Sequence, residues 1–224
     1  MKPFEKLGEA LAPDGAILQL VRRDEEFLIL TDNVPLMSSR MHNSEEELAT
    51  LACGSLKSVP APAVLIGGLG MGFTLRATLN VLPTSAIVIV AELIPEVVTW
   101  NRDTLGAFAG HPLQDPRTQI VVGDVAQSIH GSSARYDAIL LDVDNGPAAF
   151  TAPANAALYD ASGIAAIHGA LKKNGAFTLW STQEDPRYVK RLQQAGFQVQ
   201  VHRVRERAAN RGRRHIIFVA RKSS

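Results

Sequence analysis

The fold is decided by the stretch Val64-Leu65-Ile66-Gly67-Gly68-Leu69-Gly70-Met71-Gly72-Phe73-Thr74-Leu75-Arg76. A short apolar run is followed by glycines at positions 68, 70 and 72, and then by an amphipathic segment. This order predicts a strand, a tight turn and the start of a helix. Glycine accepts the backbone angles that such a turn needs, and it leaves no Cβ where a ligand lies against the backbone. We therefore expect Gly68, Gly70, Met71 and Gly72 to contact a bound ligand.

A second apolar run, residues 86–91, ends in Glu92, about twenty residues after the turn. A carboxylate at this place can accept hydrogen bonds from both hydroxyls of a ribose, as in nucleotide-binding βαβ units. The glycine spacing is G-x-G-x-G, and Phe73 stands where the dinucleotide motif G-x-G-x-x-G needs glycine. The pattern therefore predicts an adenosine-containing ligand and argues against a nicotinamide dinucleotide.

Composition indicates a globular protein with no polyanionic partner. The chain has 224 residues, of which 46% are hydrophobic, and its 23 Lys and Arg balance 22 Asp and Glu. One cysteine, Cys53, excludes an intramolecular disulfide, and no cluster of histidines or acids has metal-ligand spacing. The N-terminal residues carry no apolar signal region, and no window is apolar enough to span a membrane. We expect a cytoplasmic protein with no metal and no membrane partner.

The first sixty residues differ from the rest. Residues 16–22 and 27–31 predict a β-hairpin, and residues 34–37 a third short strand. Ser44, followed by three glutamates, is typical of a capped helix start. We expect a hairpin appendage with a lead-in helix over residues 1–60 and a ligand-binding domain over residues 61–224.

From residue 63 onward, strands and helices alternate. Apolar runs between helices indicate strands buried on both faces of a parallel sheet. After the last predicted helix, two β-runs follow with no room for a crossover helix, so the final strand must return antiparallel. The strands are predicted at 63–67, 86–92, 118–122, 138–141, 176–180, 197–204 and 215–220, and the helices at 72–81, 95–105, from 125, 158–172 and 186–195. This order predicts an α/β, Rossmann-like class I methyltransferase fold: a mostly parallel seven-stranded sheet with an antiparallel last strand and a small N-terminal β-hairpin appendage.

Ligands of open α/β sheets bind at the carboxyl ends of the strands, so the residues there are the candidates for the site. They include Glu92 with Leu93, and Asp124 with Val125. Asp124 can cap the helix that follows it, and it can also accept a hydrogen bond from an adenine amine while Val125 packs on the ring. The two roles are compatible.

Asp142 and Asp144 leave the sheet at the same end, after a fully apolar strand. They can simply begin a loop. Alternatively they hold a positive charge, a sulfonium or an amine, and one of them takes a proton from the attacking group. Both are candidate catalytic residues, and Asp142 is also a candidate for contact with the cofactor.

Other residues carry weaker signals. His42 can reach the same cleft, although a lone histidine is more often structural, and Tyr159 and Trp180 are expected to pack in the core. Residues 203–214 hold six arginines against one glutamate. Such a segment is usually just solvated; otherwise it attracts an acidic substrate, an RNA backbone or an acidic partner.

Together these residues resemble the spermidine synthase (polyamine aminopropyltransferase) family, which has the class I methyltransferase fold. The resemblance runs from the hairpin and lead-in helix through the glycine turn, residues 92–95, 123–124, 136–142, 158–159 and 171–175. It implies that Glu92 binds the ribose, Asp124 binds the adenine and Asp142 acts as the catalytic base. It also makes a homodimer plausible.

Three departures accompany the resemblance. Met71 stands where the family has an aspartate that holds one end of decarboxylated S-adenosylmethionine, and the Asp-Ser-Ser-Asp that grips the polyamine becomes Asp142-Val143-Asp144-Asn145. The tyrosine motif of the lead-in helix becomes residues 44–47, without tyrosine. The interpretation favoured by these losses is methyl transfer from S-adenosylmethionine to a small-molecule acceptor. Aminopropyl transfer from the decarboxylated cofactor, a non-catalytic adenosyl-binding module and RNA methylation remain open as alternatives.

Overall fold

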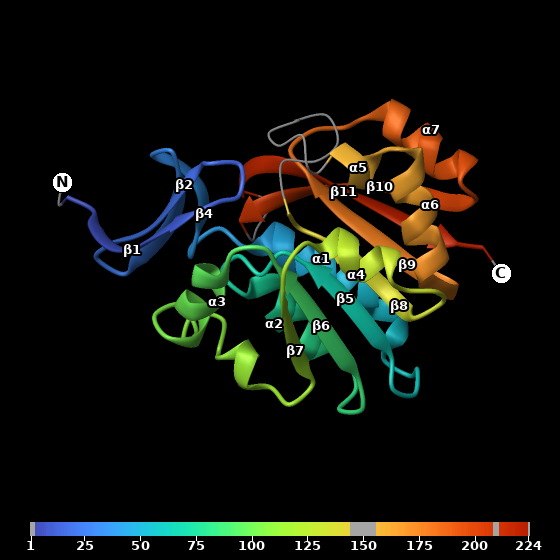
Figure 1. Ribbon diagram of the computed structural model, residues 1–224, viewed down its shortest axis with the longest axis horizontal. Helices are drawn as coiled ribbons and strands as arrows, with labels where there is room; N and C mark the ends of the chain where they lie inside the picture. Colours follow the sequence, from blue (N-terminus) through green and yellow to red (C-terminus); the bar gives the residue numbers. More distant parts are fainter. Residues whose placement is uncertain (1–2, 144–155, 208–210, 224) are drawn as a thin grey trace.

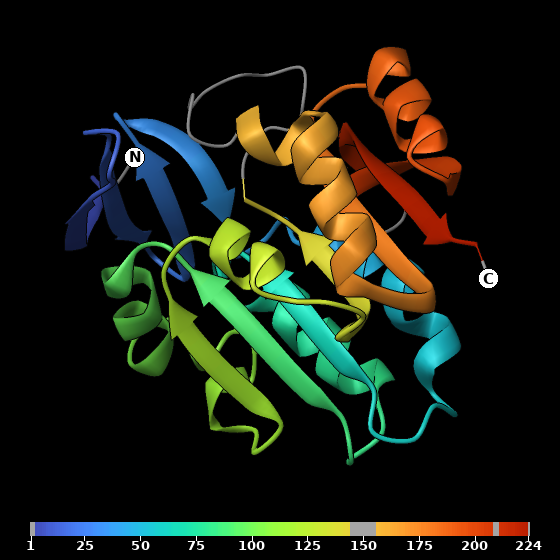
Figure 2. The ribbon, with the colours of Figure 1, turned by 45° about the vertical axis from the view of Figure 1, so that its right-hand side comes forward.

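The computed structural model describes residues 3–143, 156–207 and 211–223. They form a seven-stranded sheet covered by helices on both faces, with a smaller four-stranded sheet beside it (Figure 1, Figure 2). The large sheet has the order β10-β11-β9-β8-β5-β6-β7. Its strands are β5 (Ala63–Gly67), β6 (Ile87–Glu92), β7 (Thr118–Val122), β8 (Tyr136–Leu141), β9 (Leu171–Ser181), β10 (Phe197–Arg207) and β11 (Arg211–Lys222).

The directions of the strands agree with the prediction. Strands β5 to β9 are parallel to one another, while β11 runs antiparallel to its two neighbours, β9 and β10. The hairpin of β10 and β11 thus closes the sheet at one edge. The α/β fold with a mostly parallel sheet and an antiparallel last strand is confirmed.

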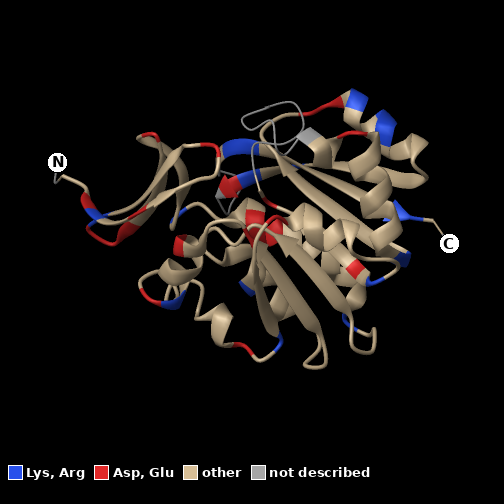
Figure 3. Cartoon of the chain, in the orientation of Figure 1, with Lys and Arg blue, Asp and Glu red and all other residues tan. Residues whose placement is uncertain are grey.

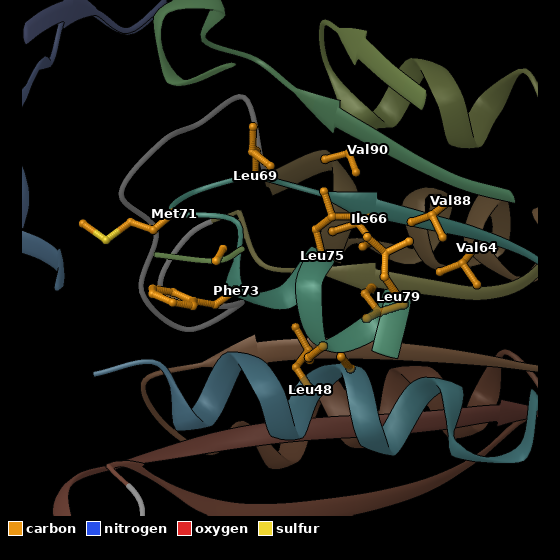
Figure 4. Close-up of a cluster of buried hydrophobic side chains, with 14 of the residues drawn as sticks. Leu48, Val64, Ile66, Leu69, Met71, Phe73, Leu75, Leu79, Val88 and Val90 are labelled. Carbon is orange, nitrogen blue, oxygen red and sulfur yellow. The ribbon is translucent and has the colours of Figure 1, made fainter. Parts of the chain in front are cut away.

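Both faces of the central strands β5, β6 and β8 are largely buried, as the unbroken apolar runs indicate. Val64 and Ile66 of β5 belong to one hydrophobic cluster, together with Leu48 and Leu75 from the helices that cover this face (Figure 4). Leu65 lies in the cluster on the opposite face. The helices are α1 (Asn43–Cys53), α2 (Phe73–Val81), α3 (Pro95–Arg102), α4 (Val125–His130), α5 (Ala156–Tyr159), α6 (Ala161–Ala170) and α7 (Pro186–Gln194), with short 3-10 helices at Gly54–Leu56 and Pro112–Gln114.

The N-terminal segment is more extensive than the predicted hairpin. It forms an antiparallel sheet of β1 (Glu5–Leu11), β2 (Ile17–Arg23), β3 (Glu26–Thr31) and β4 (Val34–Ser38), in that order. Leu20 and Ile29 are buried in the same cluster as Trp100 of α3, so this sheet packs against the larger body. The division of the chain at residue 60 stays a prediction.

Two predicted helix boundaries were wrong. The N-cap of α1 is His42 rather than Ser44, and the Ser44 hydroxyl instead donates to Glu45 Oε2 at 2.6 Å. The helix expected at 158–172 is two helices separated at Asp160, whose side chain caps α6 by accepting from Gly163 N. Residues 171–173 belong to β9. Within the described ranges no helix is long and apolar enough to cross a membrane.

Candidate active site

The glycine turn joins β5 to α2, and all three of its predicted glycines have left-handed backbone. The φ angles are 87° at Gly68, 52° at Gly70 and 83° at Gly72. A Cβ on Gly68 would overlap the carbonyl oxygen of Asp142, and a Cβ on Gly70 would lie 2.6 Å from Met37 Cε. The turn therefore needs glycine for its backbone angles and for the close approach of other parts of the protein. This reason is independent of any ligand.

Glu92 ends β6 with its side chain buried at the edge of the sheet. Its Oε2 accepts from Leu69 N at 2.8 Å and its Oε1 accepts from Ile94 N at 2.9 Å. Burial raises the pKa of Glu92, although these backbone N–H groups favour its charged form. The carboxylate thus fixes the glycine turn to the start of α3. The backbone N–H groups of Leu93 and Gly70 also favour the charged form, and a carboxylate only accepts hydrogen bonds, so a hydroxyl in the pocket can donate to it.

Asp124 has the capping role that its position indicated. It is the N-cap of α4, and its Oδ1 accepts from Ala126 N at 2.8 Å. Val125 is buried directly after it, and Gly123 N donates to the carbonyl of Glu92 at 2.8 Å. The ends of β6 and β7 are therefore held together, with Asp124 beside the same opening as Glu92.

Asp142 follows β8 and is held by α2. Its Oδ2 accepts from the Thr74 hydroxyl at 2.9 Å, and its backbone N donates to the carbonyl of Gly67 at 3.0 Å. Burial raises the pKa of Asp142 to about 6, while the Thr74 hydroxyl favours the charged form. A carboxylate with its pKa in this range is better matched to accepting a proton near neutral pH than a solvated aspartate is.

A second buried acid, Glu45, approaches Asp142 from α1. Glu45 is only 9% exposed, and the Ser44 hydroxyl donates to its Oε2. Burial, and next the negative charge of Asp142, raise the pKa of Glu45 to about 8. Glu45 is therefore mostly protonated at neutral pH beside an ionised Asp142. Sequence reasoning treated Glu45 only as an acid of the first helical turn, and it did not identify Thr74.

These elements surround a pocket with about 170 Å³ of free space. Seven predicted site residues line it: Gly68, Gly70, Glu92, Leu93, Asp124, Val125 and Asp142. The opposite wall comes from the N-terminal sheet, a contribution that sequence reasoning missed. It consists of Leu18, Ile29, Leu36 and Met37. The small sheet thus covers the ligand side of the glycine turn with apolar groups.

Two predicted ligand contacts lie elsewhere. Met71 is 1% exposed and belongs to the hydrophobic core; Figure 4 shows it extending from the turn away from Val64 and Val88. Gly72 begins α2 and faces Asn101, since a Cβ there would lie 2.9 Å from Asn101 Oδ1. Neither is among the pocket-lining residues, and a contact between either and a ligand stays a prediction. Asp144 lies outside the described residues.

The weaker candidates are packed against other residues. His42 stacks on Phe73 with ring centroids 4.2 Å apart, and its Nδ1 lies 2.7 Å from Glu46 Oε1. Tyr159 is buried in the core, as expected. Trp180 is partly buried and lies against His215, with ring centroids 4.7 Å apart. In the described parts of the chain, no group of histidines, cysteines or acids has the arrangement of a metal site.

Comparisons with known proteins agree with this architecture. Residues 41–205 match the model of the Spermine/spermidine synthase domain family. Spermidine synthase from Thermotoga maritima has the same fold, with a TM-score of 0.74 and 20% identity over 97% of this chain and 72% of that one. A spermidine synthase in complex with the transition-state analogue AdoDATO has a TM-score of 0.78 and 21% identity, over 97% of this chain and 74% of that one. A probable spermidine synthase from Corynebacterium glutamicum has a TM-score of 0.68 and 18% identity, over 99% of this chain and 81% of that one. No curated protein sequence matches the chain.

Proposed function

Because the chain belongs to the spermine/spermidine synthase domain family, we propose that it transfers an aminopropyl group from decarboxylated S-adenosylmethionine to an amine. The observation that carries the proposal is the placement of Asp142. This carboxylate lines the same pocket as Glu92 and Asp124, the two residues suited to an adenosyl ligand. The complex of a spermidine synthase of this fold with AdoDATO supports a related ligand here.

The residues of the pocket fit the nucleoside part of the donor. The Glu92 carboxylate can accept from ribose hydroxyls, and Asp124 can accept from the adenine amine while it still caps α4. Val125 and Leu36 give apolar surface on which a purine ring can pack. Gly68 and Gly70 bring the backbone of the turn to the wall of the pocket.

Asp142 would act on the acceptor amine. When bound, the donor supplies an electrophilic carbon on a positively charged sulfur; the amine nitrogen bonds to that carbon as the carbon–sulfur bond breaks and its electron pair goes to sulfur. The amine must first lose a proton, because an ammonium has no lone pair for the attack. Asp142 is placed to take that proton, and the Thr74 hydroxyl fixes its orientation. The rest of the rate enhancement would come from alignment of the two reactants.

The sequence interpretation favoured methyl transfer, whereas the family match supports aminopropyl transfer. That interpretation relied partly on Met71, which replaces an acid of the family motif. Since the Met71 side chain is buried outside the pocket wall, it would neither attract nor repel the charged end of a donor.

The test is to incubate the chain with each donor and a series of primary amines, and to identify the sulfur product. Methylthioadenosine formed only from the decarboxylated donor would support the proposal. S-adenosylhomocysteine formed from the intact donor would refute it in favour of methyl transfer. Donor binding with no product from any amine would refute it in favour of a binding module.

The role of Asp142 needs its own variant. Asp142→Asn should lower kcat by roughly 100-fold or more while leaving the calorimetric affinity for the donor nearly unchanged. Asp103→Asn, at an exposed aspartate after α3, is the matched control and should keep full activity. Equal kcat values for the two variants would exclude Asp142 as the base.

A further inference from the structure

The arginine-rich end of the β10–β11 hairpin extends past the edge of the sheet where the pocket lies. Leu141 of β8 pairs with Leu179 of β9, so Asp142 lies one residue beyond that level. Ile216 of β11 pairs with Ser181, the last residue of β9. Because β11 is antiparallel, the residues before Ile216 continue beyond the carboxyl end of β9. Arg213 and Arg214 therefore lie past the carboxyl edge of the sheet.

The register allows an order-of-magnitude separation. Arg213 lies four residues further along the strand direction than Asp142 and two strands across the sheet. Side chains alternate between the faces of a sheet, and Leu140 and Ile217, which have the same parity as Asp142 and Arg213, belong to one cluster, so Asp142 and Arg213 share a face. With about 3.3 Å per residue and about 4.8 Å between strands, the two backbones are roughly 16 Å apart, a distance that a small molecule and an arginine side chain can span.

Contacts with α1 hold the hairpin beside the acid pair. Asn43, the first residue of α1, donates from Nδ2 to the carbonyl of Arg205 at 2.8 Å. Glu45 follows two residues later on the same helix. Figure 3 shows basic segments gathered at this end of the hairpin. Val204 also packs against the core cluster. The hairpin is thus anchored beside the site and is not a free tip.

The charge at this end is strongly positive. The segment 203–214 contains six arginines and one glutamate. Arg213 and Arg214 are exposed, and Arg203, which pairs with Glu184 at 2.6 Å, is also mostly exposed. The only glutamate of the segment, Glu206, lies against His215 at 3.4 Å. We name Arg203, Arg205, Arg213 and Arg214 the basic hairpin.

This charge distribution is unfavourable for a simple diamine. A diamine bound by one nitrogen at Asp142 would direct its second ammonium toward a surface of guanidinium groups, and like charges repel. A molecule with an amine at one end and an anion at the other would complement both regions. Guanidinium groups bind carboxylates with paired hydrogen bonds.

We propose that the acceptor is an amino carboxylate, whose terminal amine lies at Asp142 and whose carboxylate is held by the basic hairpin. This inference rests on the proposed aminopropyl transfer and names the class of its acceptor. The transfer itself is unchanged: the new bond forms at the terminal nitrogen, the carbon–sulfur bond breaks, and the nitrogen proton goes to Asp142.

Ornithine and putrescine are the probes, because they differ by a single carboxylate on the same carbon chain. In calorimetry, without donor, ornithine should bind the intact chain roughly tenfold more tightly than putrescine. With the decarboxylated donor, kcat/KM should show the same preference. The double variant Arg213→Gln/Arg214→Gln should remove most of this preference by weakening the binding of ornithine.

The control is Lys57→Gln/Lys173→Gln, which removes the same charge from exposed sites. Lys57 follows the 3-10 helix Gly54–Leu56, and Lys173 lies near the start of β9, at the other end of that strand from the pocket. The control should keep the preference. A preference of the wild type for putrescine, or an ornithine preference that survives in the arginine variant, would overturn the inference while leaving aminopropyl transfer intact. Arginine-dependent binding of ornithine without turnover would support the acceptor class and refute the proposed reaction.

Discussion

Replacing Glu45 with glutamine should make the protein more stable than the wild type, and the difference should grow as the pH rises. The Glu45 carboxyl is buried, and its folded-state pKa of about 8 lies well above the ordinary 4.5. A raised carboxyl pKa means that the folded protein holds the proton more tightly than the unfolded chain does. The resulting stability is complete below pH 4.5 and is lost progressively as the pH rises through 8.

The size of the effect follows from that window. One pKa unit corresponds to about 1.36 kcal/mol. Because the unfolded chain ionises at position 45 while the folded protein keeps the proton up to about pH 8, the free energy of unfolding falls by roughly 3 kcal/mol at pH 7 and by roughly 5 kcal/mol above pH 8, relative to its value below pH 4.5. Glutamine has nearly the same shape and no charge. The variant should therefore match the wild type below pH 4.5 and exceed it by an increasing margin as the pH rises toward 8.

Urea unfolding at pH 5, 7 and 8.5 is the assay. Glu47→Gln is the control, because Glu47 lies two residues further along α1 and is exposed. Its free energy of unfolding should follow that of the wild type at every pH. Parallel pH dependences for Glu45→Gln and the wild type would refute the reasoning, since Glu45 would then have no raised pKa. Asp142→Asn tests the coupling: without the Asp142 charge the pKa of Glu45 is raised less, so the loss of stability with rising pH should be smaller and should end at a lower pH.

Three further changes test other parts of the site. Glu92→Gln should weaken calorimetric binding of the adenosyl donor by roughly 10- to 100-fold, because hydrogen bonds to a charged group are lost; unchanged affinity would remove Glu92 from the donor site. Gly68→Ala should lower the melting temperature much more than Gly15→Ala. Both glycines have φ near 90°, but only the Cβ at position 68 would overlap the carbonyl of Asp142, so equal shifts would mean that the close approach carries no energy. Asp124→Ala should cost about 1 kcal/mol of unfolding free energy through the lost helix cap, whereas Asp124→Asn should cost less; equal losses in urea unfolding would argue against the cap.

The centre of the large sheet was predictable because its strands β5, β6 and β8 are largely buried on both faces. Continuous apolar runs at β5, β6 and β8 need no knowledge of their neighbours to be identified as parallel strands, and the predicted family and transferase class are confirmed with them. Strand β1 was missed for the opposite reason. Its sequence, EKLGEAL, carries three charged residues, and only Ala10 is buried, so its pairing with β2 leaves no apolar pattern.

The site was predictable to the extent that it lies at strand ends. The rule for carboxyl ends placed Glu92, Asp124 and Asp142 in one region, and all three line the pocket. Met37 and Leu36 reach the pocket only because the N-terminal sheet packs against the glycine turn, and that packing has no signature in the local sequence. Thr74 is equally hidden, because its partner Asp142 is 68 residues away.

Glu45 is different, because the sequence does contain the signal that identifies it. Leu48, Ala49 and Ala52 lie three, four and seven residues after it, and all three are fully buried, so Glu45 occupies the apolar stripe of α1. Glu46 and Glu47 lie off that stripe and are exposed. A carboxyl group on the buried stripe is costly unless it is neutralised or paired. Its presence there, close enough to Asp142 for that charge to raise its pKa, indicates an acid kept for the chemistry of the pocket rather than for the stability of the helix. The stability gained by Glu45→Gln at high pH should accordingly be accompanied by a loss of kcat, whereas a variant that gains stability and keeps full activity would assign Glu45 no part in the reaction.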